Sequence, residues 1–370
     1  MSFPIDDTTR AELAPHGFDE AQLADFAERA RSGSGADNSV KGLVTVPAEG
    51  DVVRLPPLGS AERAALRERG LAAIREGRVG AVILAGGMAT RFGGVVKAAV
   101  PVLGERTFLE IKVEDVAEAA REAGGRIPIY VMTSFATHAR IEEHAKDKRL
   151  DRFADAPITC FSQLVSLRLT PEGALFREAD GTLSPYATGH GDLTFALRAS
   201  GLLAAFREGG GQLLYMSNVD NLGATLEPAI VGMHLARGAA VTVEVVAKEP
   251  GDKGGAPARV DGKPQIVEGF RFPQAFDQDA IPVFNTNTFV LDATAVDRDF
   301  PLPFYRVEKK VEGCVAIQFE RLVGELTAFV PSAFVLVDRD GPDGRFQPAK
   351  DPEELARRLP HIQAIIEGRR

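Results

Sequence analysis

The chain has no tryptophan, and only two of its 370 residues are cysteines. Cys160 and Cys314 lie far apart, with no His or Cys at ligand spacing, which argues against a disulfide framework and a zinc site. No stretch approaches the roughly 18 apolar residues of a membrane span, and the first residues lack a signal-peptide pattern. We therefore expect a cytoplasmic protein of a reducing compartment with no membrane partner.

Long runs of lysine and arginine are also missing. The chain holds 43 Lys and Arg against 52 Asp and Glu, and its formal charge is -9. Nucleic-acid binding needs a basic face that neutralises phosphates, so no nucleic-acid partner is expected. Any anion that this protein binds must be met by a few local cations. The hydrophobic content of 45% is enough to fill one large core or several smaller ones.

The hydrophobic pattern alternates between strands and helices. Amphipathic helices over 18–31 and 60–77 flank a Gly/Ser/Pro-rich segment, and apolar runs then alternate with longer helical stretches. This alternation predicts an α/β fold with a mostly parallel sheet covered on both faces. Short strands broken by Gly and Pro over about 255–292 predict an antiparallel insertion beside the sheet. The other expected elements are strands 80–85, 127–133, 158–162, 212–217, 239–248 and 332–338, and helices 107–123, 135–146, 192–208, 225–236, 313–328 and one from about 351.

A glycine-lined loop follows the first of these strands. Residues 82–94 read Val-Ile-Leu-Ala-Gly-Gly-Met-Ala-Thr-Arg-Phe-Gly-Gly. Gly86 and Gly87 let backbone N–H groups approach a phosphate or a base edge, and Arg91 adds a planar charged fork. The loop fits neither the usual ATPase pattern nor the dinucleotide pattern. It is either a nucleotide-binding loop, with Arg91 directed at the phosphates, or a tight glycine-rich turn.

Two neighbouring segments carry further polar groups. Lys97 is a lone cation in an apolar stretch, so it is either a snorkelling surface residue or the counter-charge of an anion. Residues 189–192, Gly-His-Gly-Asp, directly precede a helix, so we expect Asp192 to cap it while the glycines expose backbone amides. His190 is either structural or a ligand contact.

A carboxylate flanked by amides follows another apolar strand. Residues 216–221 read Met-Ser-Asn-Val-Asp-Asn and offer oxygen ligands at the carboxyl edge of the sheet. Such ligands suit Mg²⁺, which takes one or two carboxylates and completes its shell with water and substrate phosphates. Asp220 is therefore a candidate metal ligand. The alternative is ordinary turn chemistry, which Asn and Asp also favour.

Taken in order, these motifs resemble the UTP–glucose-1-phosphate uridylyltransferase family of the eukaryotic type. The similarity runs from about residue 60 to 357. The stretches that carry it are Leu-Ala-Gly-Gly at 84–87, Gly-His-Gly-Asp at 189–192, Ser-Asn-Val-Asp-Asn-Leu-Gly-Ala-Thr at 217–225, Lys-Gly-Gly at 253–255 and Phe-Asn-Thr-Asn at 284–287.

The resemblance implies a nucleotidyltransferase on a GT-A-like, Rossmann-related sheet. Its substrates are then UTP and glucose 1-phosphate, its products UDP-glucose and pyrophosphate, and its cofactor Mg²⁺. The chemistry is an in-line attack on the UTP α-phosphorus, without a covalent enzyme intermediate. We divide the chain accordingly into an N-terminal helical segment (1–78), a catalytic domain (79–340) and a C-terminal segment (341–370).

The resemblance also assigns site residues by position. It implies contacts with phosphates from Lys97, Arg91 and Lys350, of which Lys350 closes on the triphosphate, and metal binding by Asp220. The implied nucleotide contacts are Leu84, Ala85, Gly86, Gly87, Met132, Gln163 and Gly191. The implied contacts with the sugar 1-phosphate are His190, Asn218, Gly255, Glu268, Asn285 and Asn287. Gly189 and Val219 are implied as further substrate-binding residues.

Departures from the family pattern leave the identity of the sugar 1-phosphate undecided. Ala89 replaces a third loop glycine, Val96 replaces a proline, and Arg91 resembles the UDP-N-acetylhexosamine pyrophosphorylase branch. Asn285 and Asn287 alternate along an expected strand and suit hydroxyl pairs, which favours glucose 1-phosphate. A UDP-N-acetylglucosamine pyrophosphorylase or a broad-specificity UDP-sugar pyrophosphorylase is the alternative.

Two further questions concern lysines and assembly. Whether Lys309 or Lys310 also contacts substrate is left open by the sequence. The assembly β-helix of eukaryotic relatives is not seen before Arg370, so we expect a monomer or a dimer.

Overall fold

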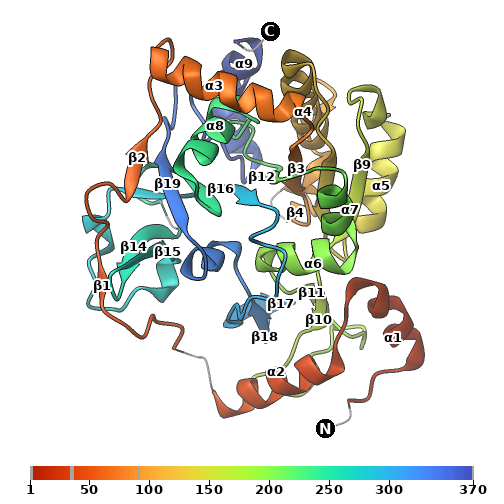
Figure 1. The fold of residues 1–370 in the computed structure, drawn as a ribbon. Coiled ribbons are helices and arrows are strands. Elements are labelled where there is room, and N and C mark those ends of the chain that lie inside the picture. The colour runs from red at the N-terminus through yellow and green to blue at the C-terminus, as the bar shows by residue number, and fades with distance from the viewer. Residues whose placement is uncertain (1–2, 34–36, 90–91, 253, 369–370) are drawn as a thin grey trace.

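The computed structural model describes residues 3–33, 37–89, 92–252 and 254–368. Eight strands of these residues form one central sheet (Figure 1). In spatial order the strands are β2 (Val52–Arg54), β19 (Ser332–Leu336), β13 (Val241–Ala247), β16 (Val283–Asp292), β12 (Leu213–Asn218), β3 (Val79–Leu84), β8 (Ile129–Thr133) and β9 (Ile158–Ser162).

The central sheet is parallel except for β16. That strand runs antiparallel to both of its neighbours, β12 and β13, whereas the other pairs are parallel. The mostly parallel α/β sheet expected from the sequence is therefore confirmed. The prediction that everything over 255–292 lies beside the sheet is wrong for β16. β16 lies in the middle of the sheet, and its apolar residues enter both cores: Phe284 and Val290 lie in one, and Val283, Phe289 and Leu291 in the other.

Helices cover both faces of the sheet, as the alternation of strands and helices requires. One core packs α3, α4, α8 and α9 against residues such as Ala81 and Ile83 of β3. The other packs α6 and α7 against Val82 of the same strand. The bounds are α3 (Ala61–Arg75), α4 (Phe108–Ala123), α5 (His138–Asp147), α6 (Leu193–Ala199), α7 (Leu202–Glu208), α8 (Pro228–Arg237) and α9 (Pro352–Glu367).

The N-terminal residues form a third, separate core. Phe26 of α2 (Glu20–Ser32) stacks on Phe319, with ring centroids 4.6 Å apart. Figure 1 shows α2 and α1 (Asp7–Leu13) at the opposite end of the molecule from α9. The later part of this segment joins the main body, because β2 pairs with β19 and α3 packs on α8.

Several small sheets surround the main one. β14 and β15 form the expected antiparallel insertion, β14 also pairs with β1, and the other small sheets are two-stranded and antiparallel. The bounds are β1 (Val44–Thr45), β14 (Ala256–Val260), β15 (Lys263–Val267), β4 (Met88–Ala89), β5 (Val95–Val96), β6 (Pro101–Leu103), β7 (Arg106–Thr107), β10 (Val165–Leu167), β11 (Pro185–Ala187), β17 (Tyr305–Val311) and β18 (Cys314–Glu320).

Two of the expected helices differ in the structure. The helix expected over 313–328 is wrong, because β18 occupies its first half and a short 3-10 helix (Val323–Ala328) its second. Glu312 and Gly313 have φ of 49° and 85°, the backbone of a tight hairpin turn. The helix expected over 192–208 is divided into α6 and α7 at Gly201, whose φ is 73°. The sequence pattern also missed α1.

Candidate functional site

The polar residues selected from the sequence lie along the carboxyl edge of the parallel strands. β3 ends at Leu84 and β12 at Asn218, and these two residues are register partners. β8 and β9 end beside them, with Thr133 opposite Ser162. Because β16 runs the other way, its first half reaches this same edge. Ligands of open parallel sheets bind outside this edge, so the fold gathers the candidate residues where a site is expected.

The glycine loop and the Gln163 segment meet at one end of this edge. Ser134 Oγ donates to the Gly86 carbonyl at 2.8 Å, and Gln163 N donates to the Thr133 carbonyl at 2.9 Å. A Cβ on Gly86 would lie 3.3 Å from Gln163 Oε1, whereas a Cβ on Gly87 would meet open space. Gly86 is therefore closely packed, and Gly87 leaves its exposed face open to a ligand.

Three other predicted nucleotide contacts are held by the sheet. Ala85 N donates to the Met132 carbonyl at 2.8 Å, and Val219 N donates to the Leu84 carbonyl at 3.0 Å. The Ala85 and Met132 side chains have no exposed area and belong to the two cores, while Leu84 is half-buried. Only backbone atoms of Ala85 and Met132 are thus near the edge. Their proposed contacts with the nucleotide stay predictions.

Lys97 and Asp220 form an ion pair at the end of β12. Lys97 Nζ contacts Asp220 Oδ2, and both side chains are largely buried, with 15% and 18% of their areas exposed. The other carboxylate oxygen accepts no hydrogen bond from the described residues. Next to them, Asn287 Nδ2 donates to Asn218 Oδ1 at 2.8 Å. The edge thus presents a lysine, a carboxylate and paired amides in one cluster.

A β-bulge in β16 brings Asn285 and Asn287 to the site. The register with β13 shifts between Glu244 and Val245, and Asn287 has a left-handed φ of 58°. Asn287 N donates to Asn285 Oδ1 at 2.8 Å. The amides therefore lie together because of the bulge, and the simple alternation expected from the sequence is not the cause.

Gly255 and Glu268 face each other beside this bulge. A Cβ on Gly255 would lie 3.0 Å from the Glu268 carboxylate, and the Gly255 carbonyl accepts a hydrogen bond of 2.7 Å from Asn285 N. Burial, together with the neighbouring Glu325 carboxylate, raises the pKa of Glu268 to about 7, against the opposing charge of Arg271. Glu268 is thus a carboxyl group that changes charge near neutral pH.

His190 is held as a neutral imidazole. Burial lowers its pKa to about 4, and Val323 N donates to His190 Nδ1 at 3.2 Å. An accepting Nδ1 leaves the proton on Nε2, which is then a hydrogen-bond donor.

The residues around His190 serve packing as well. A Cβ on Gly189 or Gly191 would lie 2.4 or 2.5 Å from backbone atoms of Arg321 or Leu322. Gly191 N also donates to the Arg321 carbonyl at 2.9 Å, so the prediction that its amide faces outward is wrong. The expected side-chain cap by Asp192 is wrong too. Its carboxylate is fully buried and accepts from Arg321 Nε at 2.5 Å.

The remaining predicted lysines are exposed. Lys350 precedes α9, and its backbone N donates to Glu354 Oε2 at 2.9 Å. Lys309 lies 3.6 Å from Glu320 on the β17–β18 hairpin, next to Lys310. Arg91 lies outside the described residues, so its predicted contact with phosphates stays a prediction.

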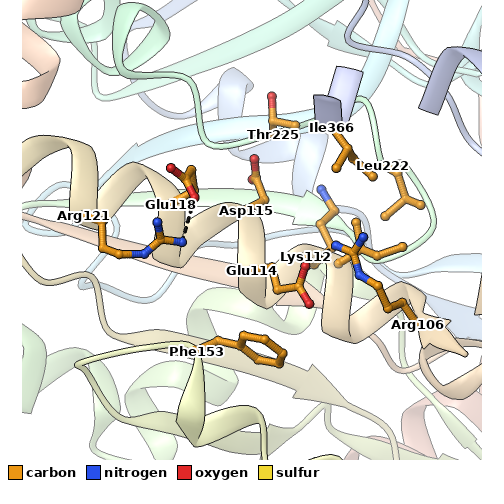
Figure 2. A pocket seen from close by; sticks show the side chains of 11 residues that line it. Arg106, Lys112, Glu114, Asp115, Glu118, Arg121, Phe153, Leu222, Thr225 and Ile366 are labelled. Atoms are coloured by element: carbon orange, nitrogen blue, oxygen red, sulfur yellow. Dashed lines mark hydrogen bonds and ion pairs between the residues drawn. The ribbon is translucent and has the colours of Figure 1, made fainter. Parts of the chain in front are cut away.

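Sequence reasoning missed a buried lysine next to the Asp220 loop. Lys112 of α4 is 2% exposed, and its Nζ donates to Ser217 Oγ at 2.9 Å and to the Ala224 carbonyl at 2.6 Å. Burial lowers its pKa to about 8. Lys112 lines a cavity of about 300 Å³. Figure 2 shows its side chain with those of Leu222 and Thr225, which line the same cavity. The signal in the sequence was a lysine on the apolar face of an amphipathic helix.

Solved structures share this fold. A Trypanosoma brucei UDP-N-acetylglucosamine pyrophosphorylase superposes with a TM-score of 0.78 at 21% identity, covering 95% of this chain and 79% of that one. A T. brucei UDP-glucose phosphorylase has a TM-score of 0.73 at 22% identity, covering 93% and 76%. The fold is therefore that of UDP-sugar pyrophosphorylases.

The chain belongs to the UTP–glucose-1-phosphate uridylyltransferase family, whose sequence profile matches residues 44–361. This confirms the resemblance drawn from the motifs. Among curated relatives, UTP–glucose-1-phosphate uridylyltransferase 2 of Dictyostelium discoideum is 29% identical over 290 residues, 74% of this chain and 56% of that protein. The Solanum tuberosum enzyme of the same family is 27% identical, over 74% and 59%. The chain thus spans little more than half the length of these relatives.

Proposed function

We propose that the protein joins UTP and glucose 1-phosphate to form UDP-glucose and pyrophosphate. The observation that carries this proposal is the cluster of Lys97, Asp220 and the Asn218–Asn287 amide pair beside the open face of Gly87. Family membership and the names of the curated relatives support it.

The reaction is a single displacement at phosphorus. An oxygen of the sugar phosphate forms a bond to the α-phosphorus of UTP, while the bond to the bridging β-phosphate oxygen breaks. Pyrophosphate leaves with that electron pair. No covalent enzyme intermediate is needed, so catalysis consists of positioning and charge neutralisation.

Charge repulsion is the main barrier to bringing the substrates together. Two unit charges about 4 Å apart repel by roughly 4 kcal/mol at an effective dielectric constant near 20. We assign Lys97 and Lys350 to offset this repulsion, and Arg91 is proposed to join them. Lys97 is held against Asp220 before substrate arrives, which fixes its ammonium group at the edge of the sheet.

His190 and the amides orient the sugar phosphate. The neutral His190 donates from Nε2, so its hydrogen bond to a phosphate oxygen does not depend on protonation near neutral pH. Asn218 and Asn287 are already paired, and each amide has further donor or acceptor capacity for phosphate or sugar hydroxyls.

The residues present fit a bound Mg²⁺. Asp220 offers one carboxylate oxygen that is not used by Lys97, and Mg²⁺ is usually held by one or two carboxylates, water and substrate phosphates. Asp220 would hold the ion, and Lys97 would stay within reach of the same phosphates. When bound, Mg²⁺ neutralises phosphate charge and favours departure of pyrophosphate.

One observation favours a second candidate, an N-acetylglucosamine 1-phosphate substrate. A cavity of about 500 Å³ adjoins Glu268, and its walls include Phe270, Phe272 and Phe284. A partly apolar recess of this kind suits an N-acetyl group. The amide cluster suits hydroxyl groups, and for this reason we place glucose 1-phosphate first.

The two cysteines bear on the cellular compartment in which the proposed reaction takes place. Cys160 is half-buried and Cys314 is exposed, and both are free. Free thiols are typical of a reducing compartment, which supports a cytoplasmic location. Among the described residues, no helix has the length and apolarity to cross a membrane.

A substrate panel tests the proposal directly. Pyrophosphate release is measured with UTP and each of glucose, galactose and N-acetylglucosamine 1-phosphate. We expect glucose 1-phosphate to exceed N-acetylglucosamine 1-phosphate by about tenfold or more in kcat/KM, which corresponds to about 1.4 kcal/mol. The reverse order would favour the second candidate, and no release with any sugar would contradict both.

A variant pair tests the assigned carboxylate. Asp220→Asn keeps the shape and removes the charge, so we expect kcat to fall about a hundredfold or more and Mg²⁺ affinity, measured by calorimetry with UTP present, to weaken. Asp25→Asn is the matched control, because it removes an exposed ion pair with Arg29 within α2, which packs in the separate N-terminal core. Equal effects of the two substitutions would remove Asp220 from the site.

A further inference from the structure

The segment that leads to Lys350 is bonded to the loop that carries Asp220. Asn221 Nδ2 donates to the Arg345 carbonyl at 3.2 Å, and Asn221 Oδ1 accepts from Gln347 N at 2.8 Å. Ala349 N donates to the Asp220 carbonyl at 3.3 Å. The backbone on the N-terminal side of Lys350 therefore runs beside the candidate metal loop, although the two are far apart in sequence.

Arg345 anchors this contact in the interior of the protein. Its guanidinium pairs with Glu244 of β13 through Nε–Oε2 at 2.6 Å and Nη2–Oε1 at 2.7 Å, and each side chain is 2% exposed. Nη2 also donates to Tyr215 Oη of β12 at 2.7 Å and to the Thr225 carbonyl at 2.8 Å. One side chain thus joins two central strands, the end of the Asp220 loop and the Lys350 segment.

The two ends of the loop over 217–225 are held by buried cations. Lys112 bonds Ser217 and Ala224, and Arg345 bonds Thr225, so neither end is free to shift alone. A Cβ on Gly223 would lie 2.8 Å from the Arg345 backbone, which shows how closely the loop and segment pack.

The energetics of the Arg345–Glu244 pair indicate that it fixes the geometry of the two segments more than it adds stability. Burying two charges costs desolvation energy that their attraction barely repays, so a buried pair is weak evidence for added stability. Its geometry, in contrast, is well determined, because the bidentate fork fixes both distance and orientation.

We propose that Arg345 is a positioning residue that fixes the Lys350 segment relative to the Asp220 loop. It holds the phosphate-binding lysine and the metal-binding carboxylate as one unit. Arg345 lies in the interior and acts through its neighbours, without contact with substrate. The expected effect on kcat rests on the proposed function. The expected coupling between the two segments does not.

The test uses a paired substitution. Arg345→Met alone would leave the Glu244 charge buried without a partner, so the informative variant is Arg345→Met with Glu244→Gln. The matched control is Arg259→Met with Asp51→Asn. It removes another bidentate pair, with contacts of 2.7 and 2.8 Å, from the small β14 sheet. Thermal unfolding establishes that both double variants are folded.

Two measurements then decide the matter. Amide hydrogen exchange should accelerate together in peptides covering 217–225 and 345–350 of the Arg345 variant, and stay unchanged there in the control. With saturating substrates, kcat should fall about tenfold or more while KM for UTP changes less than about threefold, since positioning acts mainly in the transition state.

Each outcome decides between the alternatives. Unchanged exchange in either peptide, or a kcat within about threefold of the parent, would overturn the proposal. An equal kcat loss in the control would also overturn it, because the loss of a bidentate pair elsewhere in the protein would then have the same effect. If the parent chain releases no pyrophosphate, the proposed function fails, and the exchange experiment still decides whether Arg345 couples the two segments.

Discussion

Glu268 is a partly buried carboxyl group on the wall of a cavity. It lies against Gly255, and the Glu325 carboxylate nearby further disfavours its ionisation. Its pKa is raised from 4.5 to about 7. A neutral Glu268 can donate a hydrogen bond to a sugar oxygen, whereas an ionised one can only accept. Burial, and not residue type, thus decides what this side chain offers a ligand.

This shift predicts how stability varies with pH. The folded state keeps the Glu268 proton up to about pH 7, while the unfolded chain loses it near pH 4.5. Glu268 therefore contributes stability below pH 4.5 that is lost as the pH rises through 7, and the loss amounts to up to about 3 kcal/mol. Between pH 5 and pH 8 the parent should lose free energy of unfolding through this group, and Glu268→Gln should not. The difference in free energy of unfolding, variant minus parent, should therefore increase with pH, as measured by urea denaturation.

A control at the protein surface separates this effect from a general one. Glu49 is exposed, so Glu49→Gln should leave the pH profile of the parent unchanged. If the free energy of unfolding of Glu268→Gln varied with pH as that of the parent does, the raised pKa of Glu268 would be contradicted.

Among the turns and loops of the candidate site, two glycines are present for different structural reasons. Gly191 packs against the Arg321–Leu322 backbone, where a Cβ would approach to 2.5 Å. Gly87, in the loop after β3, has open space at the same position. Close packing between a turn and a neighbouring strand end explains the first glycine, whereas the open space at the second leaves room for the proposed nucleotide.

Alanine substitutions at these glycines should therefore separate stability from binding. Gly191→Ala should lower the free energy of unfolding by about 1–3 kcal/mol, because the backbone must shift to admit a methyl group. Gly87→Ala should leave unfolding unchanged and weaken UTP binding. Neither glycine has a positive φ, so an alanine causes no left-handed backbone strain at either position. Denaturant unfolding and calorimetry with UTP give the two readings, and a destabilised Gly87→Ala would contradict this division of roles.

For the molecule as a whole, the exposed apolar side chains and the net charge bear on the assembly that we expect in solution. The large exposed apolar side chains of the described residues come from several separate segments: Leu43, Val46, Leu58, Met88, Val95, Phe270 and Val315. Stable large assemblies need broader apolar patches, and a formal charge of -9 adds repulsion between copies.

We therefore expect a monomer or at most a dimer in solution. Light scattering at low and moderate salt measures this, and the higher salt concentration tests whether screening of the charge changes the state. An octamer under either condition would contradict the prediction.

The sequence allowed the sheet and the polar segments at its carboxyl edge to be predicted, for a local reason. A buried parallel strand needs an apolar run, and its carboxyl end needs polar or small residues, so β3 with Gly86 and β12 with Asp220 were recognisable. The hairpin β17–β18 was not, because its apolar residues also suit a helix face. Nor was the bulge at Asn287, since a shift in register depends on the partner strand.

Lys350 was implied only by the family resemblance, whereas the alternation of strands and helices, the glycine loop and the lone cation at Lys97 could be recognised in the sequence alone. Those features are local, because they follow from the spacing of side chains along one segment. Three features required the tertiary fold: the pairing of Arg345 with Glu244, the position of Lys112 under the Asp220 loop, and the rise of the Glu268 pKa to about 7. Each of these depends on burial and on charges brought together from distant segments, which no single stretch of sequence contains.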